Sequence, residues 1–255
     1  MDFLLECIGF PASVDERDLV RLAAEQGEPA PWRGPPADHR LLRLGGGLQV
    51  RADRDPDGGH WSLTPFYEVP HRLRLSIETV VRPPDSPFDA LLTGWAAPPT
   101  PFEERGDGGA YRLAAWISDA RRLGRRVQAG QVVAVSVAGF ALAVDDVLPP
   151  GAGPASDLPQ EAAVVRPLGG PAAPGGCCDV SLRVRAVRRI LNEVTGETVE
   201  MVVCAAPERP MVLFLPQAQL EQDGLPPPRP GWRVEGTFLF SGRLSGGLPR
   251  PRATP

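Results

Sequence analysis

A long segment in the middle of this chain occurs a second time about a hundred residues later. RLRLSIETVVRPPDSPFDALLTGWAAP, residues 72–98, aligns without gaps with SLRVRAVRRILNEVTGETVEMVVCAAP, residues 181–207. Leu73, Arg74, Ala96, Ala97 and Pro98 have identical partners in Leu182, Arg183, Ala205, Ala206 and Pro207. After an insert, each copy continues into another β-rich segment, GQVVAVSVAGFALAV from Gly130 and GWRVEGTFLFSGRL from Gly231. A repeat of this size indicates two copies of one small β domain.

Each copy holds short apolar runs of strand length, separated by turns rich in proline and glycine. The order of three strands, an irregular segment and further strands resembles an OB-fold, a small Greek-key barrel. The resemblance rests on the long first hairpin and on glycines at two matching places. These are Gly130 and Gly231 before the fourth strand, and Gly139 and Gly242 late in it. A pair of β-sandwiches or SH3-like barrels would give much the same pattern.

We therefore expect a mainly β protein with a small N-terminal α+β module followed by two tandem OB-like barrels. The boundaries are an N-terminal module (1–70), β-barrel repeat 1 (71–148), a Pro/Gly/Ala-rich linker (149–176), β-barrel repeat 2 (177–247) and a frayed tail (248–255). Within the module, FLLECIGF predicts a strand, and Ser13 with Glu16 has the form of a capping box that opens a short helix. GLQVRADRD and HWSLTPFYEV, joined by DPDGG, predict a hairpin.

All 27 positively charged residues are arginine, because the chain has no lysine. The bias runs through the whole sequence and is typical of a GC-rich genome. It excludes chemistry that needs lysine, such as a Schiff base, a pyridoxal-phosphate anchor or a P-loop. We identify no cofactor or metal motif, and the spacing of Cys7, Cys177, Cys178 and Cys204 supports neither a disulfide framework nor a zinc site. Buried thiols are the better interpretation.

The formal net charge is −4, so the protein as a whole lacks the basic surface typical of nucleic-acid-binding domains. The N-terminus has acidic residues where a signal peptide needs positive charge, and no apolar run of about 18 residues indicates a membrane span. We expect a bacterial cytoplasmic protein that does not associate with membranes.

Two arginine clusters are the candidate binding residues. Arg121, Arg122, Arg125 and Arg126 lie between the third and fourth strands of repeat 1, and Arg183, Arg185, Arg188 and Arg189 lie on the first strand of repeat 2. Strand alternation predicts Arg183, Arg185 and Arg189 on the outer face. In an OB-like barrel, such arginines bind phosphates while aromatic residues stack on bases, and Trp95 and Tyr111 are available in repeat 1. Arginines that are solvated and paired with the many acidic residues are the competing interpretation.

His60 is the one histidine near several carboxylates, those of Asp53, Asp55 and Asp57. An acid–base site there is the weakest hypothesis, because DPDGG is first of all a turn composition. The expected function is a non-enzymatic binding or scaffolding protein whose partner is another protein or a second copy of this chain. Single-stranded nucleic-acid binding through the arginine clusters is the alternative, and an enzyme using His60 is the second alternative.

Overall fold

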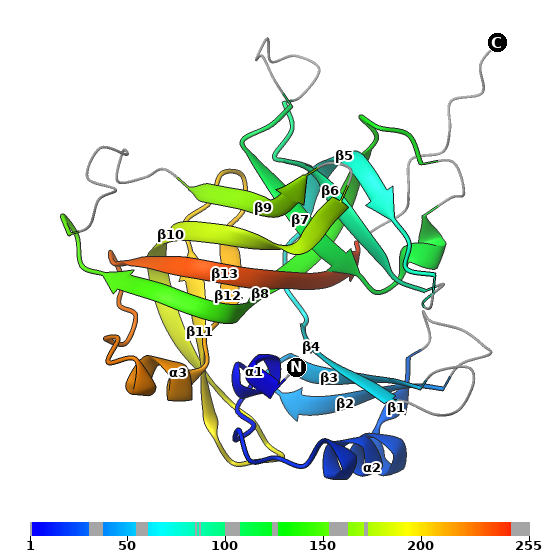
Figure 1. Ribbon diagram of the computed structural model, residues 1–255, viewed down its shortest axis with the longest axis vertical. Coiled ribbons are helices and arrows are strands. Elements are labelled where there is room, and N and C mark those ends of the chain that lie inside the picture. The colour runs from blue at the N-terminus through cyan, green and yellow to red at the C-terminus, as the bar shows by residue number, and fades with distance from the viewer. Residues whose placement is uncertain are drawn as a thin grey trace.

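The computed structural model describes residues 2–30, 38–54, 61–84, 86, 88–99, 108–123, 127–152, 163–170 and 173–245. The fold is mainly β, with one sheet of four strands and one of nine. The smaller sheet belongs to the N-terminal module, which lies below the larger sheet in Figure 1.

The N-terminal module contains two helices and the four-stranded sheet. Its elements are α1 (Asp2–Glu6), α2 (Glu16–Gln26), β1 (Glu28–Pro29), β2 (His39–Gly45), β3 (Leu48–Arg54) and β4 (Trp61–Tyr67), with the strands in that order across the sheet. The predicted hairpin is confirmed, because β3 and β4 pair antiparallel. The strand predicted for FLLECIGF is wrong: the segment forms α1, because a short apolar run has no period that separates a strand from a buried helix.

The second helix begins two residues later than the capping box predicts. Asp15, not Ser13, is the N-cap of α2, and its carboxylate accepts a hydrogen bond of 2.8 Å from the backbone N–H of Arg17. Aspartate and serine are both good N-cap residues, so the choice depends on where the preceding turn places the chain.

The nine-stranded sheet contains every strand predicted for the two repeats. Its strands are β5 (Leu73–Val81), β6 (Ala90–Ala96), β7 (Tyr111–Ile117), β8 (Val132–Leu148), β9 (Val164–Gly170), β10 (Ala173–Leu191), β11 (Thr198–Cys204), β12 (Met211–Phe214) and β13 (Arg233–Leu244). A 3-10 turn (Ala120–Arg122) follows β7, and helix α3 (Gln217–Gln222) follows β12.

Strands β8 and β13 pair antiparallel along most of their length and belong to two closed rings of strands at once. The first ring runs β5, β6, β7, β13, β8 and back to β5. The second runs β10, β11, β12, β8, β13 and back to β10. Each ring thus takes one strand from the other half of the chain, and the β8–β13 ribbon crosses the middle of the molecule (Figure 1).

The two rings are closed by equivalent strands. In the first ring β5 pairs with β8, with Leu73 opposite Val135, and in the second β10 pairs with β13, with Leu182 opposite Val234. In each ring the third strand joins the ribbon in parallel, near Gly242 and near Gly139 respectively.

The predicted linker contains regular structure that its composition did not indicate. Strand β9 and the first residues of β10 lie within 149–176 and pair with each other. Proline and glycine lower strand propensity, but Pro167 is tolerated in β9 because this strand lies at the edge of the sheet.

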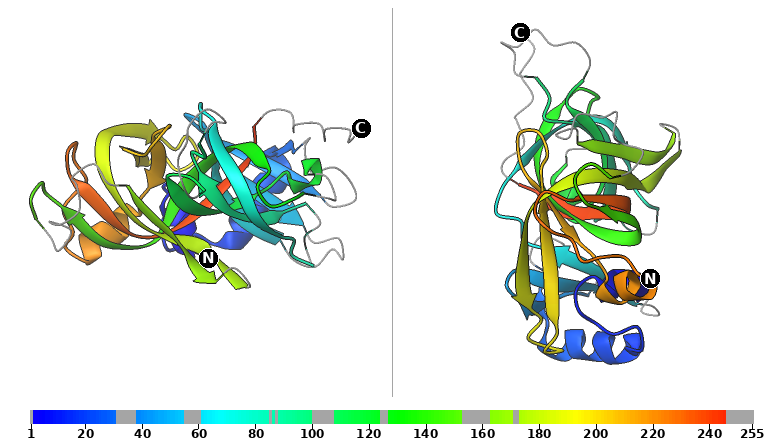
Figure 2. Two further views of the ribbon diagram at one scale, coloured as in Figure 1. Left: turned by 90° about the horizontal axis from the view of Figure 1, so that it is seen from above. Right: turned by 90° about the vertical axis from the view of Figure 1, so that its left-hand side faces the viewer.

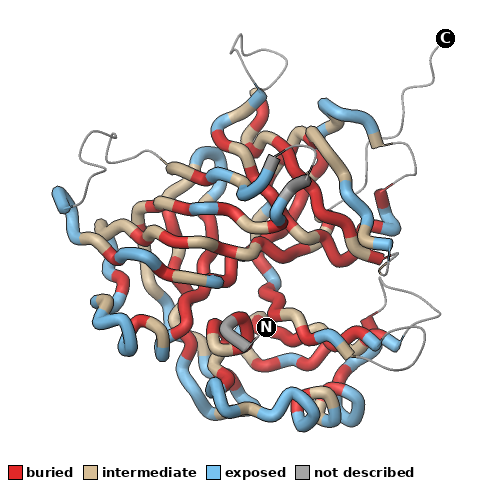
Figure 3. Tube along the Cα trace, viewed as in Figure 1, coloured by how far each residue is buried: buried red, intermediate tan, exposed pale blue. Residues whose placement is uncertain are grey.

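The N-terminal module packs on both halves of the larger sheet. The tip of the β10–β11 hairpin reaches down along the module (Figure 2), where Asn192 Nδ2 donates a 2.8 Å hydrogen bond to the carbonyl oxygen of Ile8. The backbone N–H of Glu193 donates to the carbonyl of Leu44 at 2.7 Å. Buried residues of the module and both rings form one continuous cluster, which includes Phe238 and Phe240. Figure 3 marks buried positions in both parts of the molecule.

Candidate binding groove between strands β7 and β9

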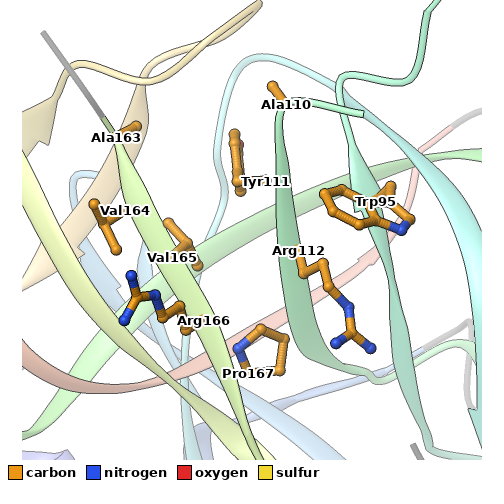
Figure 4. Close-up of a pocket in the computed structure, with 9 residues that line it drawn as sticks. All are labelled: Trp95, Ala110, Tyr111, Arg112, Ala163, Val164, Val165, Arg166 and Pro167. Carbon is orange, nitrogen blue, oxygen red and sulfur yellow. The ribbon is translucent and has the colours of Figure 1, made fainter. Parts of the chain in front are cut away.

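A groove of about 430 Å³ lies between strands β7 and β9. Its lining is Trp95, Ala110, Tyr111, Arg112, Ala163, Val164, Val165, Arg166 and Pro167 (Figure 4). These residues come from β6, β7, β9 and the residues just before β7 and β9. The lining therefore combines aromatic, aliphatic and cationic side chains, and none of its described residues is acidic.

Both walls of the groove are strand edges. Among the described residues, β9 pairs only with β10. Strand β7 pairs with β6 along its whole length, but with β13 only at Trp116 and Ile117. In the part of the chain that the structure describes, the edge of β7 before Trp116 therefore has no partner strand on the side that faces β9.

The backbone of Arg112 points toward the groove. The N–H of Ala114 lies 3.3 Å from Cys178 Sγ on β10, so the backbone groups of Ala114 face away from β6. Backbone groups of alternate residues in a strand point to the same side. The N–H and C=O of Arg112 consequently point to the side on which Cys178 and β9 lie.

The interior of the groove is apolar. In Figure 4 the side chains of Tyr111, Val165 and Pro167 lie between the two strands. Tyr111 and Val165 are each only 4% exposed, and burial, followed by the negative charge of Glu208, raises the pKa of Tyr111 above its ordinary value. Because proline has no N–H, Pro167 limits hydrogen bonding along the edge of β9.

The rims of the groove carry charge. Arg112 projects from the far side of β7 beside Trp95, and Arg166 projects from β9 on the side opposite to Val165 (Figure 4). Arg112 makes an ion pair with Glu78 at 2.9 Å, and both side chains are about one-third exposed. Gly108 lies against the Trp95 indole, where a Cβ atom would come within 2.6 Å of the ring, so only glycine fits there without displacing the ring.

The first predicted arginine cluster is tied into the fold where the structure describes it. Arg122 Nη1 lies 2.9 Å from Asp119 Oδ2 and donates a 2.8 Å hydrogen bond to the carbonyl oxygen of Leu244. The guanidinium of Arg121 lies 4.3 Å from the centroid of the Phe88 ring. Arg125 and Arg126 lie outside the described residues.

The second predicted cluster lies on the outside of β10. Leu182 and Val184 are buried, Arg185 and Arg189 are exposed as predicted, and Arg183 is half-buried. Arg183 is directly opposite Arg233, the first residue of β13, whereas Arg122 contacts Leu244, the last. The 12 residues of β13 span about 35 Å, so these members of the two clusters lie at opposite ends of that strand.

The predicted acid–base residues His60, Asp55 and Asp57 lie outside the described residues. Asp53, the fourth member, is buried in a different set of contacts with His39 and Arg51. In the part of the chain that is described, no three His, Cys, Asp or Glu side chains are placed to hold a metal ion.

All four cysteines are free thiols, and Cys7, Cys178 and Cys204 are buried as predicted. Burial raises the pKa of Cys178 to about 12, with a smaller opposing effect of the hydrogen bond to the Ala114 backbone. Such thiols stay protonated and unreactive near neutral pH.

Comparison of the chain with protein-family models, with curated proteins and with solved structures finds no match. Within the described residues, no helix is both long enough and apolar enough to cross a membrane. Trp95 and Tyr111 were identified from the sequence as available aromatic residues, but Arg112 and Arg166 were not. Each is a single arginine in its strand, and nothing in the sequence shows that β7 and β9 face one another.

Proposed function

We propose that this protein is a non-enzymatic binding protein that accepts an extended segment of a partner protein between β7 and β9. The observation that carries the proposal is the groove itself, in which two strand edges face each other over an apolar interior. An extended peptide that adds to a sheet edge gains backbone hydrogen bonds for affinity, and pockets for alternate side chains give specificity.

The two walls have different roles in this proposal. The backbone of Arg112 pairs with the incoming segment, since its N–H and C=O point into the groove. Val165 and Pro167 form the opposite wall, which is mainly apolar, and hold the segment in place by van der Waals contact. Trp95 lies beside Arg112 at the rim, where an aromatic ring adds contact area at a small cost in conformational entropy.

We further propose that each ring is an OB-like barrel, and that the rings are two copies of one domain that exchange a strand. A three-stranded meander closed by two further strands supports this, as does the pairing of the first strand of each ring with its fourth, β5 with β8 and β10 with β13. OB-folds bind ligands on the face of their second and third strands, which in the first ring are β6 and β7. Thr93 and Ala114 on that face are buried, so its open part is the end near Trp95 and Arg112.

Single-stranded nucleic-acid binding, the alternative expected from the sequence, has less support. The described members of the two arginine clusters lie at opposite ends of β13, and Arg122 is held by Asp119. Arg189 lies 3.6 Å from Glu200, and the net charge of the chain is negative. A surface built for phosphates normally concentrates unpaired cations on one face.

Selection of peptides by phage display tests the proposal. Random twelve-residue peptides are selected on the immobilised full-length chain and then titrated, as fluorescein conjugates, against purified variants. Ala110→Trp fills the groove from an exposed lining position, and Ala152→Trp places the same side chain on an exposed turn elsewhere. Ala110→Trp is expected to weaken binding at least tenfold, about 1.4 kcal/mol, while Ala152→Trp leaves it unchanged.

Peptides that bind Ala110→Trp as tightly as the wild-type chain would contradict the proposal. So would labelled single-stranded DNA or RNA that binds in a strongly salt-dependent way and is released by Arg185→Glu. That result would establish the nucleic-acid alternative instead.

A further inference from the structure

We infer that the segment accepted by the groove is acidic, and that carboxylates of the partner bind the guanidinium groups of Arg112 and Arg166, one at each rim. This inference rests on the function proposed above and adds the chemistry of the partner.

Arg112 has hydrogen-bond donors that its partner in the fold does not use. Its Nε and Nη2 atoms both donate to the same oxygen, Oε2 of Glu78, at 3.0 and 2.9 Å. A guanidinium has five N–H donors in a fixed planar arrangement. The remaining donors, including both of those on Nη1, are therefore available to a second carboxylate at the rim of the groove.

Arg166 provides a second cation on the other wall. It is exposed, and it makes no ion pair with any other residue in the described part of the chain. Its cross-strand neighbour Asp179 instead accepts a 3.0 Å hydrogen bond from Thr237 Oγ1. Other arginines at the surface differ: Arg74 and Arg243 are held by Glu208 and Glu68 at 2.9 and 2.7 Å.

The described lining of the groove therefore carries an excess of positive charge. Among the described lining residues two are arginines and none is acidic, and Glu78 lies next to only one of the two arginines. A basic segment would be repelled by this lining. A carboxylate would gain charge-assisted hydrogen bonds, which are stronger than those between neutral groups.

Strand alternation also predicts the pattern of the segment. Tyr111 and Val165 are buried on the inner side of their strands, while Arg112 and Arg166 lie on the outer side. A segment that pairs with the free edge of β7 places alternate side chains on these two sides. The groove accordingly fits an acidic residue on the outer side that is flanked by small apolar residues on the inner side.

The peptides selected by display are the probe for this inference. Those that lose binding to Ala110→Trp are expected to be enriched in glutamate or aspartate that alternates with apolar residues. Replacing the acidic residue by its amide in such a peptide is expected to weaken binding about tenfold. Arg112→Gln and Arg166→Gln are expected to remove this preference, while Arg185→Gln, an exposed arginine outside the groove, retains it.

Glu78→Gln is expected to change the affinity for the acidic peptide in the opposite direction, and it serves as a second readout. It removes the competing carboxylate from Arg112, so the acidic peptide is expected to bind several-fold more tightly. Groove-dependent peptides that bind equally well with an amide in place of the acid would overturn the inference and leave the proposed function standing. A selection that yields no groove-dependent peptide would overturn both.

Discussion

Four charged or ionisable side chains are buried together where β2 and β3 meet the segment before β6. His39 Nδ1 lies 2.7 Å from Asp53 Oδ1, and Arg51 Nε lies 2.7 Å from Asp53 Oδ2. Arg51 Nη1 is 3.5 Å from Asp89 Oδ1, and the His39 ring packs edge-on against Phe88. Burial by itself would lower the pKa of Arg51, but the charges of Asp53 and Asp89 outweigh it and the pKa is raised. The cluster therefore joins the module to the first ring through paired charges.

We predict that Asp53→Asn destabilises the whole molecule. It leaves Arg51 buried with only the more distant carboxylate, and removing one member of a buried ionic cluster typically costs about 3–5 kcal/mol. Asp38→Asn, which breaks an exposed pair with Arg40, is the control and should cost less than about 1 kcal/mol. Denaturant unfolding of both variants measures the difference, and equal losses would show that the buried cluster adds nothing specific.

Which residues form the groove was only partly predictable. Sequence reasoning found Trp95 and Tyr111 because aromatic residues are few in this chain. It favoured runs of arginine over single ones, although Arg122 within a run is bound to Asp119 and the isolated Arg166 makes no ion pair in the described part of the chain. Whether an arginine is paired within the fold depends on its neighbours across the sheet, and strand pairing sets which residues those are.

Among the elements, β8 and β13 show why glycine is required where a third strand joins each of them. A Cβ atom on Gly242 would overlap the carbonyl oxygen of Ser136 on β8. One on Gly139 would come within 2.7 Å of Leu213 and 2.8 Å of Phe240. Both glycines lie where a third strand joins the ribbon in parallel. The missing side chain allows close approach of the backbones at Gly242 and close packing of the Leu213 and Phe240 side chains at Gly139.

We predict that Gly242→Ala lowers the free energy of unfolding by about 3 kcal/mol, because backbone rather than a flexible side chain must move. Gly224→Ala is the control, since its Cβ would meet open space and the cost is that of its positive φ, about 1 kcal/mol. Thermal and denaturant unfolding would measure both. A Gly242→Ala chain as stable as the Gly224→Ala chain would contradict the close backbone contact between β13 and β8 at this position.

Element types were predictable where the local pattern is strong. Strands β5 to β8 and β10 to β13 follow from alternating apolar residues and from turns such as the one at Asn192, which accepts hydrogen bonds from Val194 and Thr195. The failures, α1 and β9, are a short apolar run and a segment rich in proline and glycine. In both, tertiary contacts decide the conformation, since β9 exists only by pairing with β10.

At the scale of the molecule, the shared ribbon makes the two halves depend on each other. The tandem repeats expected from the sequence would each close their own barrel, but here each ring needs a strand from the other half. The sequence could not show this exchange, because two copies of one pattern allow a strand to pair within its own copy or across to the other.

We predict that residues 1–152 and residues 163–255, expressed as separate chains, are each largely unfolded. Neither contains both β8 and β13, so neither can close a ring. Mixed together, they should associate into one folded complex, because every pairing of the intact chain is then restored. Circular dichroism and size-exclusion chromatography would report this, and a cooperative unfolding transition in either fragment alone would contradict the account.

The most direct test of the central claim is amide hydrogen exchange of the full-length chain with and without a display-selected peptide. A segment that pairs with β7 should slow exchange at 111–113 and at 163–166, while 183–189, which carries the second arginine cluster, stays unchanged. A peptide that binds while exchange at β7 and β9 is unaltered would contradict the proposal that this groove is the binding site.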